Sequence, residues 1–229
     1  MNRGDPMNLL GLGPAKGGGN DKALLSRSAF LFNGVMKEKL KNAVVGIAGL
    51  GGLGSNVAIA LARTGVGKLI VADFDKVEPG NLNRQQYFVD QIGKAKVECM
   101  IENLRRINPD VKVEGHQVKL TSGNIPEIFS GAQVIAECFD KADAKQMIVE
   151  TVLGKMKKCA IVSVSGLAGY GKSNAIQTRR ISERLILVGD NESGIDLVKV
   201  LTAARVAIAA NHQANAIVEV ILDGEIWES

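Results

Sequence analysis

Apolar positions follow two kinds of pattern along the chain. Short, nearly continuous apolar runs occur at residues 44–48, 69–72, 134–139 and 160–165. Such runs are typical of strands that are buried on both faces of a parallel sheet. Between them lie segments in which apolar residues recur at helical spacing. We therefore predict an α/β protein, with a Rossmann-like, mostly parallel sheet, helices on both faces and a C-terminal antiparallel extension.

Helical spacing is found at residues 53–64, 94–108 and 202–222. The second of these segments is amphipathic, and Pro109 closes it. Asn124 is predicted to cap a short helix that runs through Phe129.

The N-terminal part of the chain has a different composition. Residues 1–22 are rich in Gly and Pro and have little apolar surface to bury, so we expect a flexible N-terminal segment. Residues 23–41 predict two short helices around Gly34. We expect residues 23–229 to form a single domain, which is long enough to bury a core of its own.

Composition excludes several classes of function. A net charge of +4 and an aromatic content of 4% argue against a nucleic-acid partner, because the charge is mild and few rings are present to stack on bases. The apolar stretches are shorter than the roughly 18 residues of a membrane span, and no signal-peptide apolar region is seen, so we expect a cytoplasmic protein. Cys99, Cys138 and Cys159 form no CxxC pair, so neither a disulfide framework nor a zinc site is predicted.

The apolar run at residues 44–48 leads directly into Gly49, Gly51, Gly52 and Gly54. Three of these glycines match GxGxxG, where a positive φ, the approach of backbone to phosphate and tight helix packing each exclude a Cβ. The following helix points its N-terminal amides at anionic oxygens. Asp73 ends the next strand, where an acid accepts hydrogen bonds from ribose hydroxyls. Alone, this motif indicates a dinucleotide oxidoreductase.

The residues after this strand favour a different nucleotide. They include a second carboxylate, the polar part of NLNRQ and a later lysine: Asp75, Asn81, Arg84, Gln85 and Lys96. A hydride-transfer site has no need of several cations and amides here, whereas a nucleoside triphosphate with a metal ion does.

Three motifs together closely resemble one superfamily, the ubiquitin-activating-enzyme-like ThiF, MoeB and HesA adenylyltransferases: GLGGLGSNVAIALARTGVG, DFD and NLNRQ. The chain is most similar to ThiF family 2. The resemblance implies an enzyme that uses ATP and Mg²⁺ to join AMP to the C-terminal glycine of a ubiquitin-like sulfur carrier ending in Gly-Gly, with release of pyrophosphate. In the ThiF branch this carrier is ThiS, of thiamine biosynthesis. The resemblance also implies a homodimer in which an N-terminal arginine reaches the partner's ATP.

The resemblance assigns a role to each candidate residue. Asp73 holds the ribose, and the turn at residues 49–54 admits the phosphates. Phosphate oxygens are bound by Asn81, Arg84, Gln85 and Lys96. Asp140, which follows the run at 134–139, holds Mg²⁺, with Asp75 as a second candidate. The alternative role for Asp140 is to cap a helix at residues 142–158. Arg27 is the candidate for the arginine that acts in trans.

The chain departs from the resembling family in three respects. The CxxC pairs that bind structural zinc in many relatives are absent, so no zinc is expected. Residues 190–199 correspond to the crossover loop that covers the carrier's tail; they are predicted to be mobile and contain no Cys, so we predict adenylation without covalent carrier transfer. The family's RYxRQ segment is also missing.

Several alternatives stay open. An NAD-binding oxidoreductase is one, and a non-catalytic carrier-binding subunit is another, although the set of Arg84, Lys96 and Asp140 argues against the second. Residues 166–173, GLAGYGKS, satisfy the P-loop pattern GxxxxGK[ST]. A P-loop must open a helix, whereas the residues that follow nearly alternate and predict a strand or hairpin. His116 and His212 lack partner ligands at metal spacing and are predicted to be structural.

Overall fold

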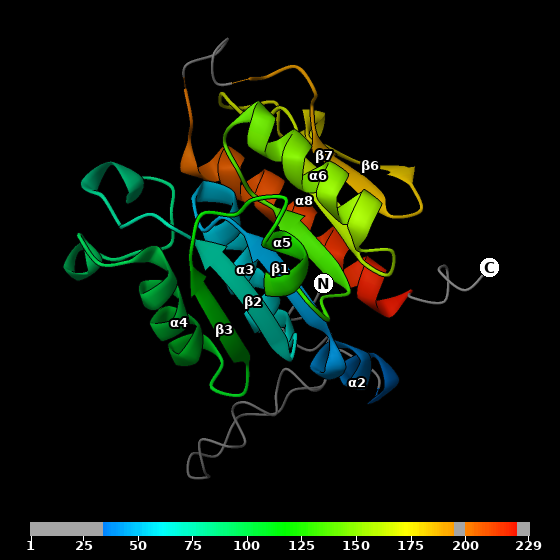
Figure 1. Ribbon diagram of the computed structural model, residues 1–229. Helices are drawn as coiled ribbons and strands as arrows, with labels where there is room; N and C mark the ends of the chain where they lie inside the picture. Colours follow the sequence, from blue (N-terminus) through cyan, green and yellow to red (C-terminus); the bar gives the residue numbers. More distant parts are fainter. Residues whose placement is uncertain (1–33, 195–199, 224–229) are drawn as a thin grey trace, which may run out of the picture. The chain divides into compact units, whose positions relative to one another are not determined.

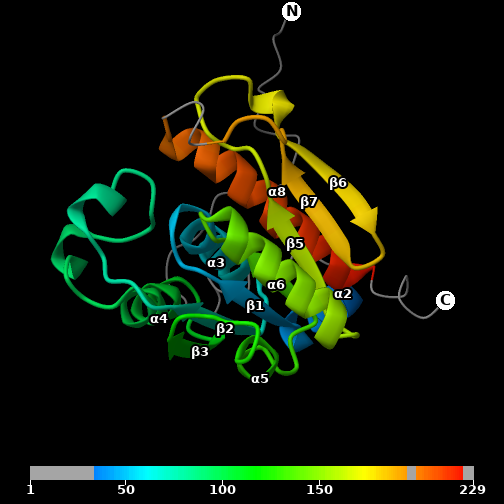
Figure 2. The ribbon, with the colours of Figure 1, turned by 45° about the horizontal axis from the view of Figure 1, so that its top comes forward.

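The computed structural model describes residues 34–194 and 200–223, which share one seven-stranded sheet (Figure 1). The strand order is β3-β2-β1-β4-β5-β7-β6. The strands are β1 (Val44–Ala48), β2 (Lys68–Asp73), β3 (Lys112–Gln117), β4 (Val134–Glu137), β5 (Ala160–Val164), β6 (Gln177–Ser182) and β7 (Leu185–Gly189). All are parallel to their neighbours except β6, which pairs antiparallel with β7 at one edge (Figure 2). The predicted fold class, including the C-terminal antiparallel extension, is confirmed.

Helices cover both faces of the sheet. The first face carries α3 (Gly52–Thr64), α4 (Lys96–Ile107) and α8 (Ala203–Leu222), of which α3 packs against both others. The second carries α5 (Ile125–Ile128) and α6 (Ala142–Lys155), which pack against each other in front of the sheet in Figure 1. The short helix α2 (Gly34–Asn42) contacts α8. The described residues also form three short 3-10 helices: η3 (Pro79–Asn81), η4 (Val89–Gln91) and η5 (Ser173–Ala175).

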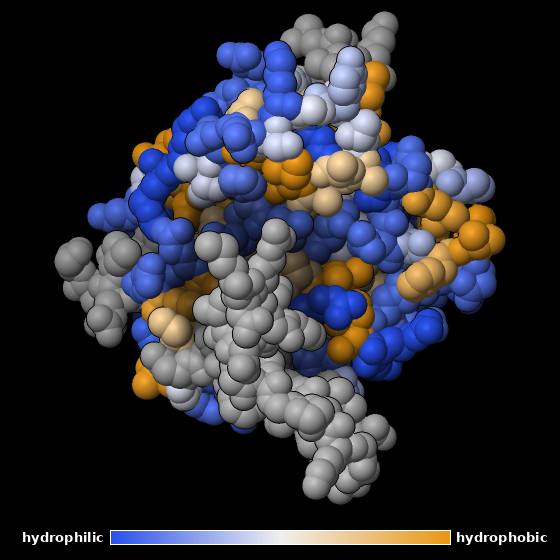
Figure 3. All heavy atoms as spheres, turned by 180° about the vertical axis from the view of Figure 1, so that it is seen from behind, coloured by the Kyte–Doolittle hydropathy of each residue, from blue (hydrophilic) through white to orange (hydrophobic). Residues whose placement is uncertain are grey.

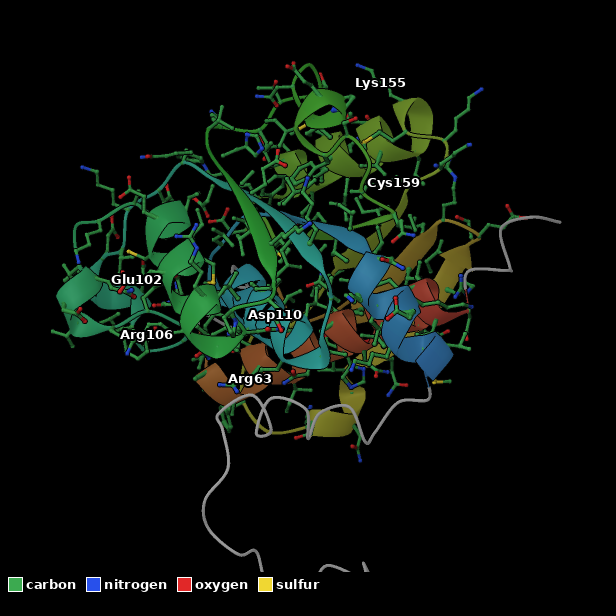
Figure 4. The ribbon with its side chains drawn as sticks, turned by 90° about the horizontal axis from the view of Figure 1, so that it is seen from below. Arg63, Glu102, Arg106, Asp110, Lys155 and Cys159 are labelled. Atoms are coloured by element: carbon green, nitrogen blue, oxygen red, sulfur yellow. The ribbon has the colours of Figure 1, made fainter. Side chains whose placement is uncertain are left out.

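The core is apolar because the central strands are covered on both faces, as their continuous apolar runs predict. All five residues of β5 and all four of β4 are buried. Phe129, Ile135 and Ile148 belong to one fully buried cluster between the sheet and the α5–α6 layer. Cys159, labelled near Lys155 in Figure 4, is part of this cluster and acts as a small apolar residue.

Most predicted elements lie where expected, and the differences have local causes. The final helix begins after Thr202, whose hydroxyl accepts a hydrogen bond from the backbone N–H of Arg205 at 3.4 Å. Asn124 lies at the N-cap of α5 as predicted, but its side chain bonds the Thr121 N–H at 2.8 Å instead of a helix N–H. The expectations for residues 1–22, for the first of the two short helices and for Arg27 fall outside the described residues.

The P-loop alternative for GLAGYGKS is wrong. This segment leads into the three-residue 3-10 helix η5 and then into β6, so it does not open an α-helix. Each histidine has a local hydrogen-bond partner, in agreement with the predicted structural roles: His116 Nε2 lies 2.8 Å from Glu114 Oε1, and His212 Nδ1 lies 3.0 Å from Thr178 Oγ1. Within the described ranges, no helix combines the length and apolarity needed to cross a membrane.

Candidate nucleotide-binding site

The glycine turn joins β1 to α3 at the carboxyl edge of the sheet. Gly49 has a φ of +94°, which favours glycine. A Cβ on Gly54 would lie 1.8 Å from the carbonyl oxygen of Gly49, so the helix can approach the strand this closely only with glycine at this position. The turn also lies against the end of β4, because a Cβ on Gly49 would be 3.0 Å from the carbonyl oxygen of Cys138. Two of the three motif glycines are thus required by the backbone itself.

Asp73 fixes the turn from the end of β2. Its Oδ2 accepts a hydrogen bond from the Leu50 N–H at 2.6 Å, and its Oδ1 accepts one from the Asp75 N–H at 2.8 Å. The residue is 8% exposed. The remaining lone pairs of this carboxylate can accept from the hydroxyls of a ribose, the role that the sequence predicts.

Lys96 is held by Asp75 in an ion pair. Its Nζ lies 3.0 Å from Asp75 Oδ2, and its backbone N–H donates to the Asp75 carbonyl at 3.0 Å. The lysine is 5% exposed, whereas the Asp75 side chain is 49% exposed. Asp75 therefore orients the buried ammonium group before any ligand arrives, and its pairing weighs against Asp75 as the metal ligand.

The segment that carries Arg84 is joined to the glycine turn by three residues that the sequence motif did not single out. The Ser55 hydroxyl donates to Gly51 O at 2.7 Å and accepts from Gln86 N–H at 3.1 Å. Asn56 donates to the Gly52 and Arg84 carbonyls at 2.6 and 3.2 Å. Tyr87 donates its hydroxyl to the Leu50 carbonyl at 2.9 Å. Burial, followed by the charge of Asp73, raises the pKa of Tyr87. In the sequence, Tyr87 could have been noticed because it directly follows the polar residues 83–86.

The other three candidate phosphate-binding residues have different surroundings: Arg84, Gln85 and Asn81. The aliphatic part of Arg84 packs 3.6 Å from the position of a Cβ on Gly52, and its Nη1 donates to Gly80 O and Asn83 Oδ1. Gln85 is 8% exposed, and its Oε1 has no hydrogen-bond partner among the described residues. The nitrogen of this side-chain amide lies 3.9 Å from the position of a Cβ on Gly51, and a ligand that donates a hydrogen bond to Oε1 would satisfy it. Asn81 Oδ1 instead accepts from the Glu78 N–H at 3.1 Å and stabilises η3.

A hollow of about 480 Å³ borders this segment. Its walls are residues 82–88, Asn56 and the first turns of α8 at Ala203, Ala204 and Ala207. The volume is in the range of small-ligand sites. Arg84 lines this hollow but the glycines of the turn do not, so the hollow flanks the phosphate turn.

Asp140 lies three residues beyond the end of β4 and is exposed. The structure gives its carboxylate no hydrogen bond among residues 34–194 and 200–223, and the N-cap of α6 is Lys141, so the capping alternative is not supported. Within these same ranges, no group of three His, Cys, Asp or Glu side chains could hold a metal ion. An exposed carboxylate without an all-protein cage fits Mg²⁺, which is commonly bound by one or two carboxylates together with substrate phosphates.

The three cysteines are buried thiols. Burial raises the pKa of Cys159 to about 12, and it also raises the pKa of Cys99 and of Cys138. Neutral, buried thiols are poor nucleophiles. None of these cysteines has the setting of a reactive thiolate.

Residues 190–194, at the start of the predicted mobile loop, are held by a buried ion pair. Arg205 Nη2 lies 2.6 Å from Asp190 Oδ2, and the same guanidinium donates to the carbonyls of Ala168, Gly171 and Lys172. Burial tends to raise the pKa of Asp190, but hydrogen bonds from Ser193 and from the backbone of Glu192, with the charge of Arg205, lower it. The loop predicted as mobile is therefore anchored at its N-terminal end.

These features define a Rossmann-like α/β protein with a glycine turn of the nucleotide-binding type. The model of the ThiF family matches residues 25–225, and the chain belongs to the ThiF family. The resemblance recognised in the sequence is thereby confirmed.

Two curated relatives are similar over part of the chain. The adenylyltransferase and sulfurtransferase uba4 of Aspergillus niger is 41% identical over 137 residues, which cover 58% of this chain and 28% of that protein. Ubiquitin-like modifier-activating enzyme 5 of Drosophila persimilis is 35% identical over 155 residues, which cover 62% of this chain and 40% of that protein. The chain spans less than half the length of these relatives.

Solved structures share the fold. The E. coli tRNA N6-threonylcarbamoyladenosine dehydratase TcdA, in complex with ATP, superposes with a TM-score of 0.79 at 22% identity, covering 91% of this chain and 97% of that one. E. coli MccB with ATP has a TM-score of 0.63 at 23% identity, covering 82% and 58%. At these identities the likeness concerns the fold.

Proposed function

We propose that this protein is an adenylyltransferase that activates the C-terminal carboxylate of a ubiquitin-like sulfur carrier of the ThiS type as an acyl-adenylate. The observation that supports it most is the arrangement at the carboxyl edge of β1 and β2. There, Asp73 is bonded to the glycine turn, and Lys96 is buried in an ion pair one connection away. The chain belongs to the ThiF family, and its relatives include proteins named adenylyltransferase and ubiquitin-like modifier-activating enzyme. These names agree with the proposed activity.

The chemistry needs positioning and charge neutralisation but no general base. A terminal carboxylate, with a pKa of about 3.5, is already ionised at neutral pH. One of its oxygens attacks the α-phosphorus in line; the new oxygen–phosphorus bond forms as the bond to the β-phosphate breaks, and pyrophosphate leaves with the electron pair. Arg84 and Lys96 would neutralise the charge on the phosphate oxygens. Asp73 would hold the ribose and Gln85 would offer its unpartnered oxygen to the nucleotide.

Asp140 would hold the Mg²⁺ that accompanies the triphosphate, and this ion would offset the charge of the departing pyrophosphate. The exposed carboxylate of Asp140 suits this role better than Asp75, whose Oδ2 is paired with Lys96. No thioester with the carrier is expected on the thiols of this chain, because all three are buried with raised pKa values.

The test is ATP–pyrophosphate exchange with a purified carrier that ends in Gly-Gly. Exchange should require the carrier and be lost with a carrier that lacks its last glycine. Absence of exchange with every such carrier at saturating Mg-ATP would overturn the proposal. Carrier binding without exchange would point to a non-catalytic subunit, and a change in NADH fluorescence on binding would point to an oxidoreductase. If a modified tRNA supported the exchange and no carrier protein did, the activity would resemble that of the tRNA dehydratase that shares the fold.

The proposal includes a homodimer in which Arg27 acts across the interface, in a single domain that begins near residue 23. Mixed dimers of Arg27→Ala and Asp140→Ala subunits test this. Partial recovery of exchange in the mixture is expected only if the two residues serve one site from different subunits, since one site in each mixed dimer then keeps both. Recovery that is no greater than the sum of the two inactive parents would remove Arg27 from the site.

A further inference from the structure

A fully buried carboxylate lies at the end of β4, three residues before Asp140, the proposed magnesium ligand. Glu137 is 0% exposed, and both of its oxygens are engaged. Oε1 accepts from the Phe139 N–H at 2.7 Å and from Lys145 Nζ at 3.1 Å. Oε2 accepts from Lys145 Nζ at 3.0 Å and from the Ser163 hydroxyl at 2.6 Å. A buried carboxylate is costly unless it is paired and hydrogen-bonded in this way.

These bonds reach three different elements. Lys145 comes from α6, Ser163 comes from β5, and the Phe139 N–H belongs to the Cys138–Phe139 peptide, in the connection that leads from β4 to Asp140. Because Phe139 N–H is bonded to a carboxylate that is itself held from α6 and β5, the path of the backbone into Asp140 is restrained by a charge-assisted hydrogen bond. A buried apolar residue at position 137 would leave that N–H without its partner.

The opposite face of the same strand end is braced from α8. The side-chain amide of Gln213, which is 0% exposed, donates to the carbonyls of Glu137 and Val162 at 2.9 and 2.7 Å. This brace matters to the glycine turn, because Gly49 and Gly54 pack against the next residue, Cys138. The end of β4 is therefore tied to helices on both faces at the point where it meets the nucleotide turn.

We propose that Glu137 is a positioning residue for the nucleotide site, which orients Asp140 toward the metal of Mg·ATP through its bond to the Phe139 N–H. The inference rests on the proposed function, since Asp140 is the metal ligand only there. Glu137 does not ligate the metal itself, because its oxygens are occupied by Lys145, Ser163 and the backbone. Its contribution is to fix the Cys138–Phe139 peptide, which sets the direction in which the backbone continues to Asp140.

The experiment measures how strongly Mg²⁺ enhances ATP binding, by titration calorimetry of the full chain with and without the ion. Asp140→Ala should lose this enhancement. Glu137→Gln removes the charge and turns one of the two acceptor oxygens into an N–H donor that faces Lys145, so it weakens the set of bonds that holds the Phe139 N–H. It should reduce the enhancement by about tenfold, within the usual range of coupling between two ligands. The double variant should lose no more than Asp140→Ala alone, because the two residues act in series. Glu150→Gln, the same change at an exposed position of α6, is the matched control and should behave as the wild type.

An undiminished Mg²⁺ enhancement in Glu137→Gln would overturn the inference, and so would equal weakening of ATP binding with and without Mg²⁺. If Glu137→Gln does not fold, Ser163→Ala decides, because it removes only one bond to the carboxylate and should lower the enhancement to a smaller extent. Binding is measured without turnover. A wild type that binds Mg·ATP but gives no exchange with any carrier would therefore contradict the proposed function and leave the test of Glu137 intact.

Discussion

Replacing Gly54 by Ala tests the close approach of α3 to β1. The added methyl carbon would lie 1.8 Å from the Gly49 carbonyl oxygen and 2.9 Å from its carbonyl carbon. An ordinary contact between carbon and carbonyl oxygen is about 3.3 Å, so the two backbones must separate by about 1.5 Å. Overpacking of this kind costs about 3 kcal/mol, and the better helix propensity of Ala returns up to about 1 kcal/mol. The net loss in free energy of unfolding should be about 2 kcal/mol.

For a domain of this size such a loss lowers the Tm by about 4–8 °C, which thermal unfolding followed by circular dichroism measures. ATP affinity should fall further than stability alone explains, because the separation moves the turn that admits phosphate. Gly80→Ala is the control: nothing lies within 4 Å of its added methyl, so it should keep both the Tm and the ATP affinity. A Gly54→Ala variant with unchanged Tm and ATP affinity would refute the account of the turn.

Three further predictions follow from the site. Lys96→Met should abolish ATP–pyrophosphate exchange while lowering the free energy of unfolding by no more than about 1 kcal/mol, because its partner Asp75 is half exposed; retained exchange would remove Lys96 from the site. Because the pKa of Asp190 is lowered in the folded state, its stabilisation is present above the unfolded pKa and lost as pH falls through the folded pKa. Asp190→Asn should therefore make the free energy of unfolding, measured with denaturant, fall less steeply as the pH is lowered. An unchanged pH dependence would contradict this. The raised thiol pKa values predict that the free energy of unfolding falls as pH rises above about 8.5, where the thiols of the unfolded chain ionise and the folded ones do not. Thiol alkylation at pH 8 should then be confined to unfolded protein, and rapid modification of the native chain would overturn the assignment.

The sequence predicted most of the fold because its hydrophobic patterns are compatible with few arrangements of strands and helices. Continuous apolar runs separated by helical spacing allow few arrangements other than a covered parallel sheet. The glycine turn was predictable in the same way, since Gly49 and Gly54 are required by backbone conformation and approach. Asp73 followed from its place at the end of the next strand.

The residues that connect the site were harder to predict, because their partners are distant in the sequence. Glu137 is one acid within an apolar run, and its partner Ser163 is 26 positions away on another strand. Arg205 is a single cation in the Ala- and Val-rich sequence of α8, and it bonds three carbonyls about 35 positions earlier. Such pairs depend on which strands and helices become neighbours, and periodicity does not contain that information.

The packing of α8 against α3 has a consequence for biosynthesis. Gly52, in the first turn of α3, is covered by Val206 of α8, since a Cβ on this glycine would lie 3.2 Å from Val206 Cγ1. Ribosomes deliver the chain from its N-terminus, so about 150 residues are synthesised between the two. A nascent chain that has already formed β1 and its glycine turn still lacks one wall of the turn. Nucleotide present during translation could therefore bind firmly only after α8 has left the exit tunnel, and a ribosome stalled before α8 would display an incomplete site.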